Sequence, residues 1–191
     1  MAAESMAQAS SQRSPYIETF QLDVFPGGRR LSACLVTGVE NAKELRAEIQ
    51  QRKFEASLLS ADMVADTFHL LVAASKAMNG LVNNCMTTHG IHTELIHCLS
   101  GAKSIVDALN NFGIREDSKS IVVAIFDEGE PAMEEVLAHV HGVRAPLMEL
   151  GSLCNRERLM KMYKIQPQEL ALPGSSLSEC AACRIAIRDS L

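Results

Sequence analysis

The chain of 191 residues contains no tryptophan and only two tyrosines, and aromatic residues make up just 4% of it. Proteins that bind unpaired nucleotides commonly stack the bases on aromatic side chains. The scarcity of aromatic rings therefore argues against a surface of that kind. Aliphatic residues and nine methionines must instead fill the interior and any docking surface.

Positive charge is also scarce, because 18 lysines and arginines stand against 23 aspartates and glutamates and leave a net charge of −5. A stand-alone nucleic-acid-binding protein needs an excess of positive charge to displace counterions from phosphates. Any contact with RNA should therefore be local or shared with a partner.

The sequence lacks an apolar run of about eighteen residues, a secretory signal and the dense cysteine spacing of a disulfide scaffold. We therefore expect a reduced, soluble intracellular protein without membrane contact. A chain of 191 residues, 47% of them apolar, is long enough for one domain. The polar segment 1–15 predicts a disordered N-terminal tail, which leaves 16–191 as a single domain.

The apolar pattern predicts an α+β fold with a small, mostly antiparallel sheet. Tyr16–Phe25 and Leu31–Val36 alternate as two strands of a hairpin, with a turn at 26–28. The β-branched run Ile121–Phe126 predicts a central strand covered on both faces, and Val143–Pro146 a short edge strand. About six or seven helices are expected, at 41–53, 66–81, 93–99, 103–112, 131–142, 155–165 and from 176 onward.

The predicted helix at Asp66–Leu81 carries three distinct faces. Two of them are apolar, and we expect both to be well buried: Phe68, Leu71, Val72 and Ser75 on one, Leu70, Ala74, Ala77 and Met78 on the other. The third face combines His69 and Lys76 with the small residues Ala73 and Gly80. Small side chains let another molecule approach the helix, so this face is a candidate groove for a phosphate or a partner. The alternative is a solvated lysine beside a half-buried histidine.

Three residue clusters are candidates for catalysis or metal binding. Cys180 and Cys183 have the spacing of a redox pair but fall inside an apolar helix stripe, which favours buried thiols. The loosely spaced Cys85, His89, His92 and His97 lack a second ligand pair, and Asp127, Glu128 and Glu130 suit a helix N-terminus as well as Mg²⁺. We therefore predict no catalytic residues, no metal and no cofactor.

Three blocks carry a family resemblance: FQLDVF at Phe20–Phe25, DTFHLLVAASKA at Asp66–Ala77 and TELIHCLSGAKSIVDALNNFGI at Thr93–Ile114. In this order and spacing they resemble the Cgi-type (TPRKB-like) family of PRPK-binding subunits of the KEOPS/EKC complex. The likeness covers almost all of 20–191. It implies a non-catalytic subunit, located in cytoplasm and nucleus, of a machine that makes threonylcarbamoyladenosine (t6A) in tRNA.

The resemblance also implies partners and site residues. Such proteins bind the small atypical kinase/ATPase of the complex, through it the threonylcarbamoyltransferase, and help to present tRNA with its 3′ CCA end. Lys76 matches the family's AAxKA lysine and Glu94 its TE glutamate, whereas the loop Thr87–Gly90 lacks the basic run of relatives. We predict RNA contact at Lys76, His69 and His89, and kinase docking at Ile165, Ile185 and Ile187. An adaptor without RNA contact and a CxxC thiol oxidoreductase remain alternatives.

Overall fold

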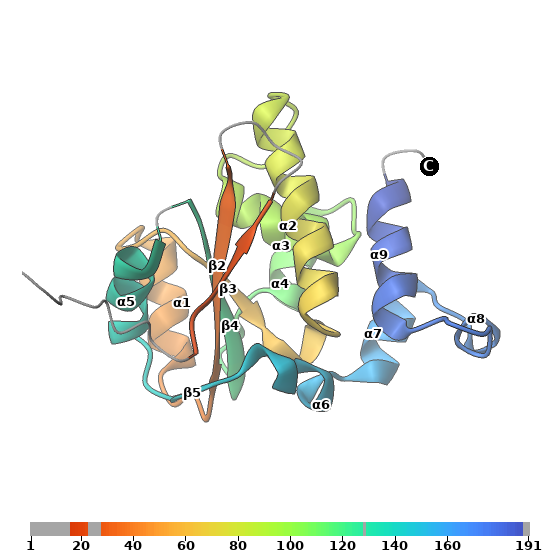
Figure 1. Ribbon diagram of the computed structural model, residues 1–191. Helices are drawn as coiled ribbons and strands as arrows, with labels where there is room; N and C mark the ends of the chain where they lie inside the picture. Colours follow the sequence, from red (N-terminus) through yellow and green to blue (C-terminus); the bar gives the residue numbers. More distant parts are fainter. Residues whose placement is uncertain (1–15, 23–27, 128, 189–191) are drawn as a thin grey trace, which may run out of the picture.

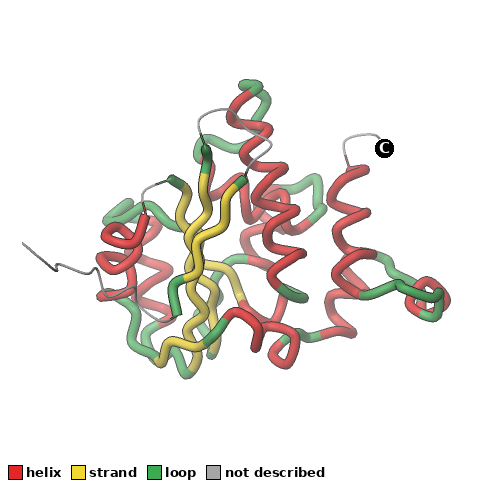
Figure 2. Tube along the Cα trace, viewed as in Figure 1, coloured by secondary structure: helices red, strands yellow, loops and turns green. Residues whose placement is uncertain are grey.

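The computed structural model of the protein describes residues 16–22, 28–127 and 129–188. The predicted tail at 1–15, most of the predicted turn at 26–28, and Glu128 lie outside them. Within this range the α+β prediction is confirmed: a five-stranded antiparallel sheet stands between helices on both sides (Figure 1; Figure 2). None of the described helices combines the length and apolar character needed to span a bilayer.

The sheet is built around two long strands that lie side by side. The strands are β1 (Glu18–Gln21), β2 (Arg30–Thr37), β3 (Ser57–Ser60), β4 (Ser120–Phe126) and β5 (Val143–Ala145). Their order is β1-β2-β4-β3, and β5 pairs with β2 on the edge that β1 also uses. The predicted hairpin, central strand and edge strand are thus all confirmed. Strand β3 was missed.

Helices cover both faces of the sheet. Among the described residues they are α1 (Ala42–Gln50), α2 (Thr67–Val82), α3 (Ile91–Ser100), α4 (Ile105–Phe112), α5 (Gly129–Ala138), α6 (Leu150–Leu153), α7 (Arg156–Tyr163), α8 (Pro167–Leu170) and α9 (Leu177–Ile187). Two 3-10 turns, η1 (Ala61–Met63) and η2 (Leu147–Glu149), join them. The count exceeds the predicted six or seven because the one-turn helices α6 and α8 are too short to show a periodic pattern.

The sheet separates two hydrophobic clusters, because successive side chains of a strand point to opposite faces. Val122, Ala124 and Phe126 of β4 pack with α2, α3, α7 and α9 in the larger cluster. Ile121 and Val123 pack with α1 and α5 in the smaller one. All of β4 but its first residue is buried, as the continuous apolar run predicted.

Asn41 stands at the N-cap position of α1 but does not cap the helix. Asn41 precedes α1, but its side chain makes no capping hydrogen bond there. Its amide nitrogen donates to the His139 carbonyl at 2.8 Å, and its amide oxygen accepts from His141 N at 3.0 Å. Asn41 therefore ties α1 to the segment after α5. At α9 the predicted capping box of Ser176 and Glu179 is present.

Candidate partner-binding surface on helix α2

Helix α2 begins at a clear cap and is enclosed on two of its three faces. The Asp66 carboxylate accepts a hydrogen bond from His69 N at 2.9 Å, which satisfies one of the free donors of the first turn. The face with Leu70, Ala74 and Met78 is fully buried against the sheet and α3. This part of the prediction is confirmed.

The face predicted to be an open groove is closed. His69, Ala73 and Gly80 are all buried, because α9 packs beside α2 and Met86 covers Gly80. The Lys76 ammonium donates to the Ile185 carbonyl of α9 at 2.5 Å. Small side chains do admit a close neighbour here, as expected, but the neighbour is the chain's own C-terminal helix. The groove prediction is therefore wrong.

His69 is the centre of a buried hydrogen-bond chain rather than a surface group. Its Nδ1 accepts from Ala65 N at 3.1 Å, which leaves Nε2–H to donate to the Tyr163 hydroxyl at 2.8 Å. The Tyr163 hydroxyl in turn donates to the Leu99 carbonyl. Burial lowers the pKa of His69 to about 4, so the ring is neutral at pH 7. Because the side chain of His69 is fully buried, it cannot make the predicted contact with RNA.

The face of α2 that carries Phe68 is apolar and open. We call it the open stripe and define it by Phe68, Leu71, Val72, Ser75 and Val82. Phe68 is 50% exposed and Val82 42% exposed, and the three residues between them are partly buried. We expected this face to be well buried, and that expectation is wrong because no other described element packs over Phe68. A large aromatic side chain left half in water is typical of an interaction surface.

The predicted kinase-docking residues are divided between core and surface. Ile165 and Ile185 are buried in the larger hydrophobic cluster, so the expectation that they form an exposed stripe is wrong. Ile187 is 43% exposed near the end of α9. Because α9 lies beside α2, Ile187 sits on the helix next to the open stripe.

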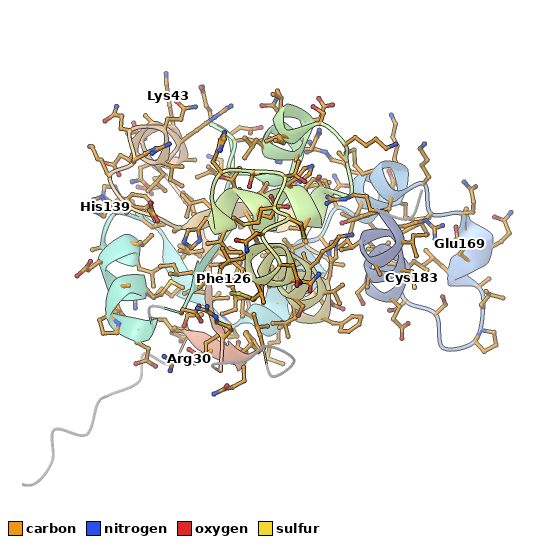
Figure 3. The ribbon with its side chains drawn as sticks, turned by 90° about the horizontal axis from the view of Figure 1, so that it is seen from above. Arg30, Lys43, Phe126, His139, Glu169 and Cys183 are labelled. Carbon is orange, nitrogen blue, oxygen red and sulfur yellow. The ribbon has the colours of Figure 1, made fainter. Side chains whose placement is uncertain are left out.

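The two cysteines of α9 also differ. Cys180 is buried and close to the Ser175 hydroxyl, whereas Cys183 is exposed (Figure 3), so they do not share a buried stripe as predicted. Both thiols are free. Elsewhere, burial raises the pKa of the Cys34 and Cys154 thiols to about 11, which disfavours the reactive thiolate.

A buried glutamate holds the loop that carries His89. Glu94 accepts a hydrogen bond from Thr88 N at 2.7 Å. Burial alone would raise the pKa of Glu94, but the hydrogen bonds from Thr88 and Thr87 hold it below its usual value. His89 is exposed on this loop. The family glutamate thus has an identifiable local role, which sequence spacing did not reveal.

The other candidate ligands do not assemble. Cys85 and His89 are exposed, while His97 is buried and neither of its ring nitrogens has a hydrogen-bond partner in the described part of the chain. Within that part, no group of three or more metal-ligating side chains is found. Asp127 instead accepts from Arg30 N at 2.8 Å and pairs with Arg29, which anchors the end of β4 to the start of β2.

Comparisons with known proteins identify the family of the chain. The model of the family described as "Kinase binding protein CGI-121" matches residues 36–189. The TPRKB subunit of the EKC/KEOPS complex from Danio rerio is 28% identical over 81% of this chain and 89% of its own length. The CGI121 subunit from Coccidioides immitis is 31% identical over 78% of this chain and 76% of its own. The family match includes α2, which carries the open stripe, and α9 beside it. The chain belongs to the CGI-121 family of kinase binding proteins.

Proposed function

We propose that this chain is a non-catalytic subunit of a KEOPS/EKC complex, in which it binds the small atypical kinase/ATPase and supports tRNA binding for t6A formation. Its relatives carry the names of EKC/KEOPS subunits, and its family is described as kinase binding. The observation that carries the proposal is the open stripe. It leaves a half-exposed phenylalanine on a helix whose other two faces are covered.

The kinase docks on the open stripe and on Ile187 of the neighbouring helix. Phe68 supplies the aromatic anchor, and aromatic anchors commonly dominate the energetics of protein interfaces. Leu71, Val72 and Val82 extend the apolar contact along the helix. The partner surface on the kinase should therefore be an apolar groove that fits a helix face.

The test is the affinity of the purified chain for its kinase. Phe68→Glu should raise the Kd at least about thirtyfold, or about 2 kcal/mol, because it buries an unpaired charge in the interface. Val143→Glu is the matched control, since Val143 is also an exposed apolar residue but lies on β5, where it pairs with Thr37 at the end of β2. An unchanged Kd for Phe68→Glu in a folded protein would reject the open stripe as the docking surface.

The tRNA contact belongs to the assembled complex. A net charge of −5 does not favour binding by the chain alone, and His69 is buried. His89, on its anchored loop, is the exposed member of the three predicted RNA-binding residues. His89→Glu should weaken tRNA binding and t6A formation by the full complex while kinase affinity stays the same. Equal tRNA affinity for both proteins would favour the alternative of a kinase-binding adaptor without RNA contact.

The thiol oxidoreductase alternative gains no support. The exposed Cys183 and the buried Cys180 are both free cysteines. A cysteine that attacks disulfides needs a thiolate stabilised by positive charge or a helix N-terminus. Cys180 and Cys183 lie beyond the first turn of α9, and Glu179 is the charged residue of that turn.

A further inference from the structure

An apolar recess lies between helices that do not carry the open stripe. It has a volume of about 260 Å³ and lies between α1, α3 and α4. Leu58, Ile96 and Ile114 are nearly buried residues that line it. We call it the edge groove.

The edge groove arises because β3 is the last strand of the sheet. Beyond β3, Ile114 N donates to the Leu58 carbonyl at 2.9 Å, and a single bridge joins Leu59 to Gly113. No further described strand continues the sheet on that side. Helix α1 covers one face of the sheet and α3 and α4 the other, so the two helical layers come together past the strand and leave an apolar recess between them.

The apolar surface continues outward from the recess along α4. Val106 is 65% exposed and Leu109 is 38% exposed, and both line the edge groove. They are three residues apart and therefore lie on the same side of the helix. The buried residues of α4 are instead Ala108 and Phe112. The exposed rim makes the apolar surface larger than the recess alone, which favours a macromolecular occupant over a small ligand.

One positive charge stands in this apolar surface. Arg46 is the single charged residue among those that line the edge groove. It is partly buried, and the described residues give it neither an ion pair nor a hydrogen bond from its side chain. The other partly buried arginines of the described chain all have acceptors: Arg29 with Asp127, Arg115 and Arg158 with Asp62, Arg144 with Glu134, Arg184 with Glu169, and Arg188 with the His97 carbonyl.

We propose that the edge groove binds a segment of a partner protein that places apolar side chains in the recess and a carboxylate against Arg46. A guanidinium half removed from water gains most from a carboxylate, which it can bind with two parallel hydrogen bonds. An RNA backbone is disfavoured, because phosphate binding needs several cations and the groove has one. The groove uses neither α2 nor α9, so this second interface is independent of the open stripe.

The proposal is tested by photo-crosslinking in the intact complex. The photoreactive residue p-benzoylphenylalanine replaces Val106, whose side chain is exposed at the rim. Crosslinks are then compared in three versions of the full chain: wild type at all other positions, Arg46→Gln, and Lys43→Gln. Lys43→Gln is the matched control because Lys43 is exposed on the same helix, loses the same charge and does not line the groove (Figure 3).

The expected result is a protein crosslink whose mapped segment contains an aspartate or glutamate. Arg46→Gln should reduce its yield at least about tenfold, and Lys43→Gln less than about twofold. Arg46→Glu combined with a lysine at the partner's acidic position should restore the yield. A crosslink to nucleic acid, to a second copy of this chain or to nothing would overturn the proposal, as would a yield insensitive to Arg46 in a variant with an unchanged melting temperature.

The same experiment separates this interface from the kinase-docking surface. Phe68→Glu should raise the Kd for the kinase at least about thirtyfold and leave the Val106 crosslink intact once the kinase is supplied in excess of that Kd. If the crosslinked segment belongs to the kinase and Phe68→Glu has no effect on kinase affinity, the open stripe fails as the docking surface and the edge groove stands. If the crosslinked segment belongs to the kinase and the crosslink is lost in Phe68→Glu at kinase concentrations that restore binding, the two surfaces form one interface and the independent edge groove is rejected.

Discussion

Two faces of helix α2 differ in what covers them. On the face with Ala73, His69, Ala73 and Gly80 are buried and α9 packs beside them, with a hydrogen bond from Lys76 to the Ile185 carbonyl. The face with Phe68 carries larger apolar side chains and is left partly in water. The small residues of the Ala73 face allow α9 to pack closely against α2. On the Phe68 face the larger apolar side chains are left partly exposed, which is why we propose that face for a partner.

The difference between the two faces is tested most directly by placing the same charge on each of them. Ala73→Glu should destabilise the free chain by about 4 kcal/mol, because it forces an unpaired carboxylate between two packed helices. Phe68→Glu should change the stability of the free chain by less than about 1 kcal/mol. Urea unfolding of both variants measures the difference. Equal losses of stability would show that the two faces are buried alike.

Two histidines, one on the covered face of α2 and one on α3, should make the stability of the chain sensitive to mild acid. Burial lowers the pKa of His69 and of His92 to about 4, against 6.5 for an ordinary histidine. The unfolded chain therefore takes up protons first, and stability falls as the pH drops from about 6.5 towards 4. Between pH 7 and pH 5.5 the free energy of unfolding should decrease by about 1.2 kcal/mol for each histidine.

Urea unfolding at several pH values measures this slope. The variant His89→Gln should retain all of it, because His89 is exposed on its loop. A free energy of unfolding that stays constant between pH 7 and pH 5.5 would contradict the burial of the two rings.

The smallest expected effect concerns the bond between the two helices. Lys76→Met removes the hydrogen bond to the Ile185 carbonyl and should cost about 1–2 kcal/mol. Amide exchange in α9 should become faster, and kinase affinity should fall with it because Ile187 lies on that helix. Lys103→Met, at an exposed lysine, is the control. If Lys76→Met leaves α9 protected and lowers only tRNA affinity in the complex, the lysine acts on RNA.

Much of the fold follows from local sequence signals. The alternation at 16–36, the β-branched run of β4 and the Ser176 capping box each specify one element without help from distant residues. Strand β3 was not predicted because Ser57 and Ser60 enclose only two leucines, and this pattern is too short to show alternation. Its serines are buried by the neighbours that surround them, which no local pattern reveals.

The candidate site was harder to predict for a different reason. Helical periodicity identifies which residues of α2 share a face, but not which face the chain covers. That choice depends on α9, which begins about a hundred residues later and whose own buried side was also assigned incorrectly at Cys183 and Ile185. The role of Arg46 could not be predicted from the sequence either. That Arg46 has no partner among the described residues is visible only once the partners of the other arginines are known.

The closure of α2 by the last helix of the described chain has a consequence for synthesis on the ribosome. Residues 67–82 emerge early, yet their His69 and Ala73 face has no cover until residues 177–187 have left the exit tunnel. At about 5–20 residues per second, this interval lasts roughly 5–20 s. During it the nascent chain displays the face that later packs against α9, so chaperones have a defined target and period in which to act.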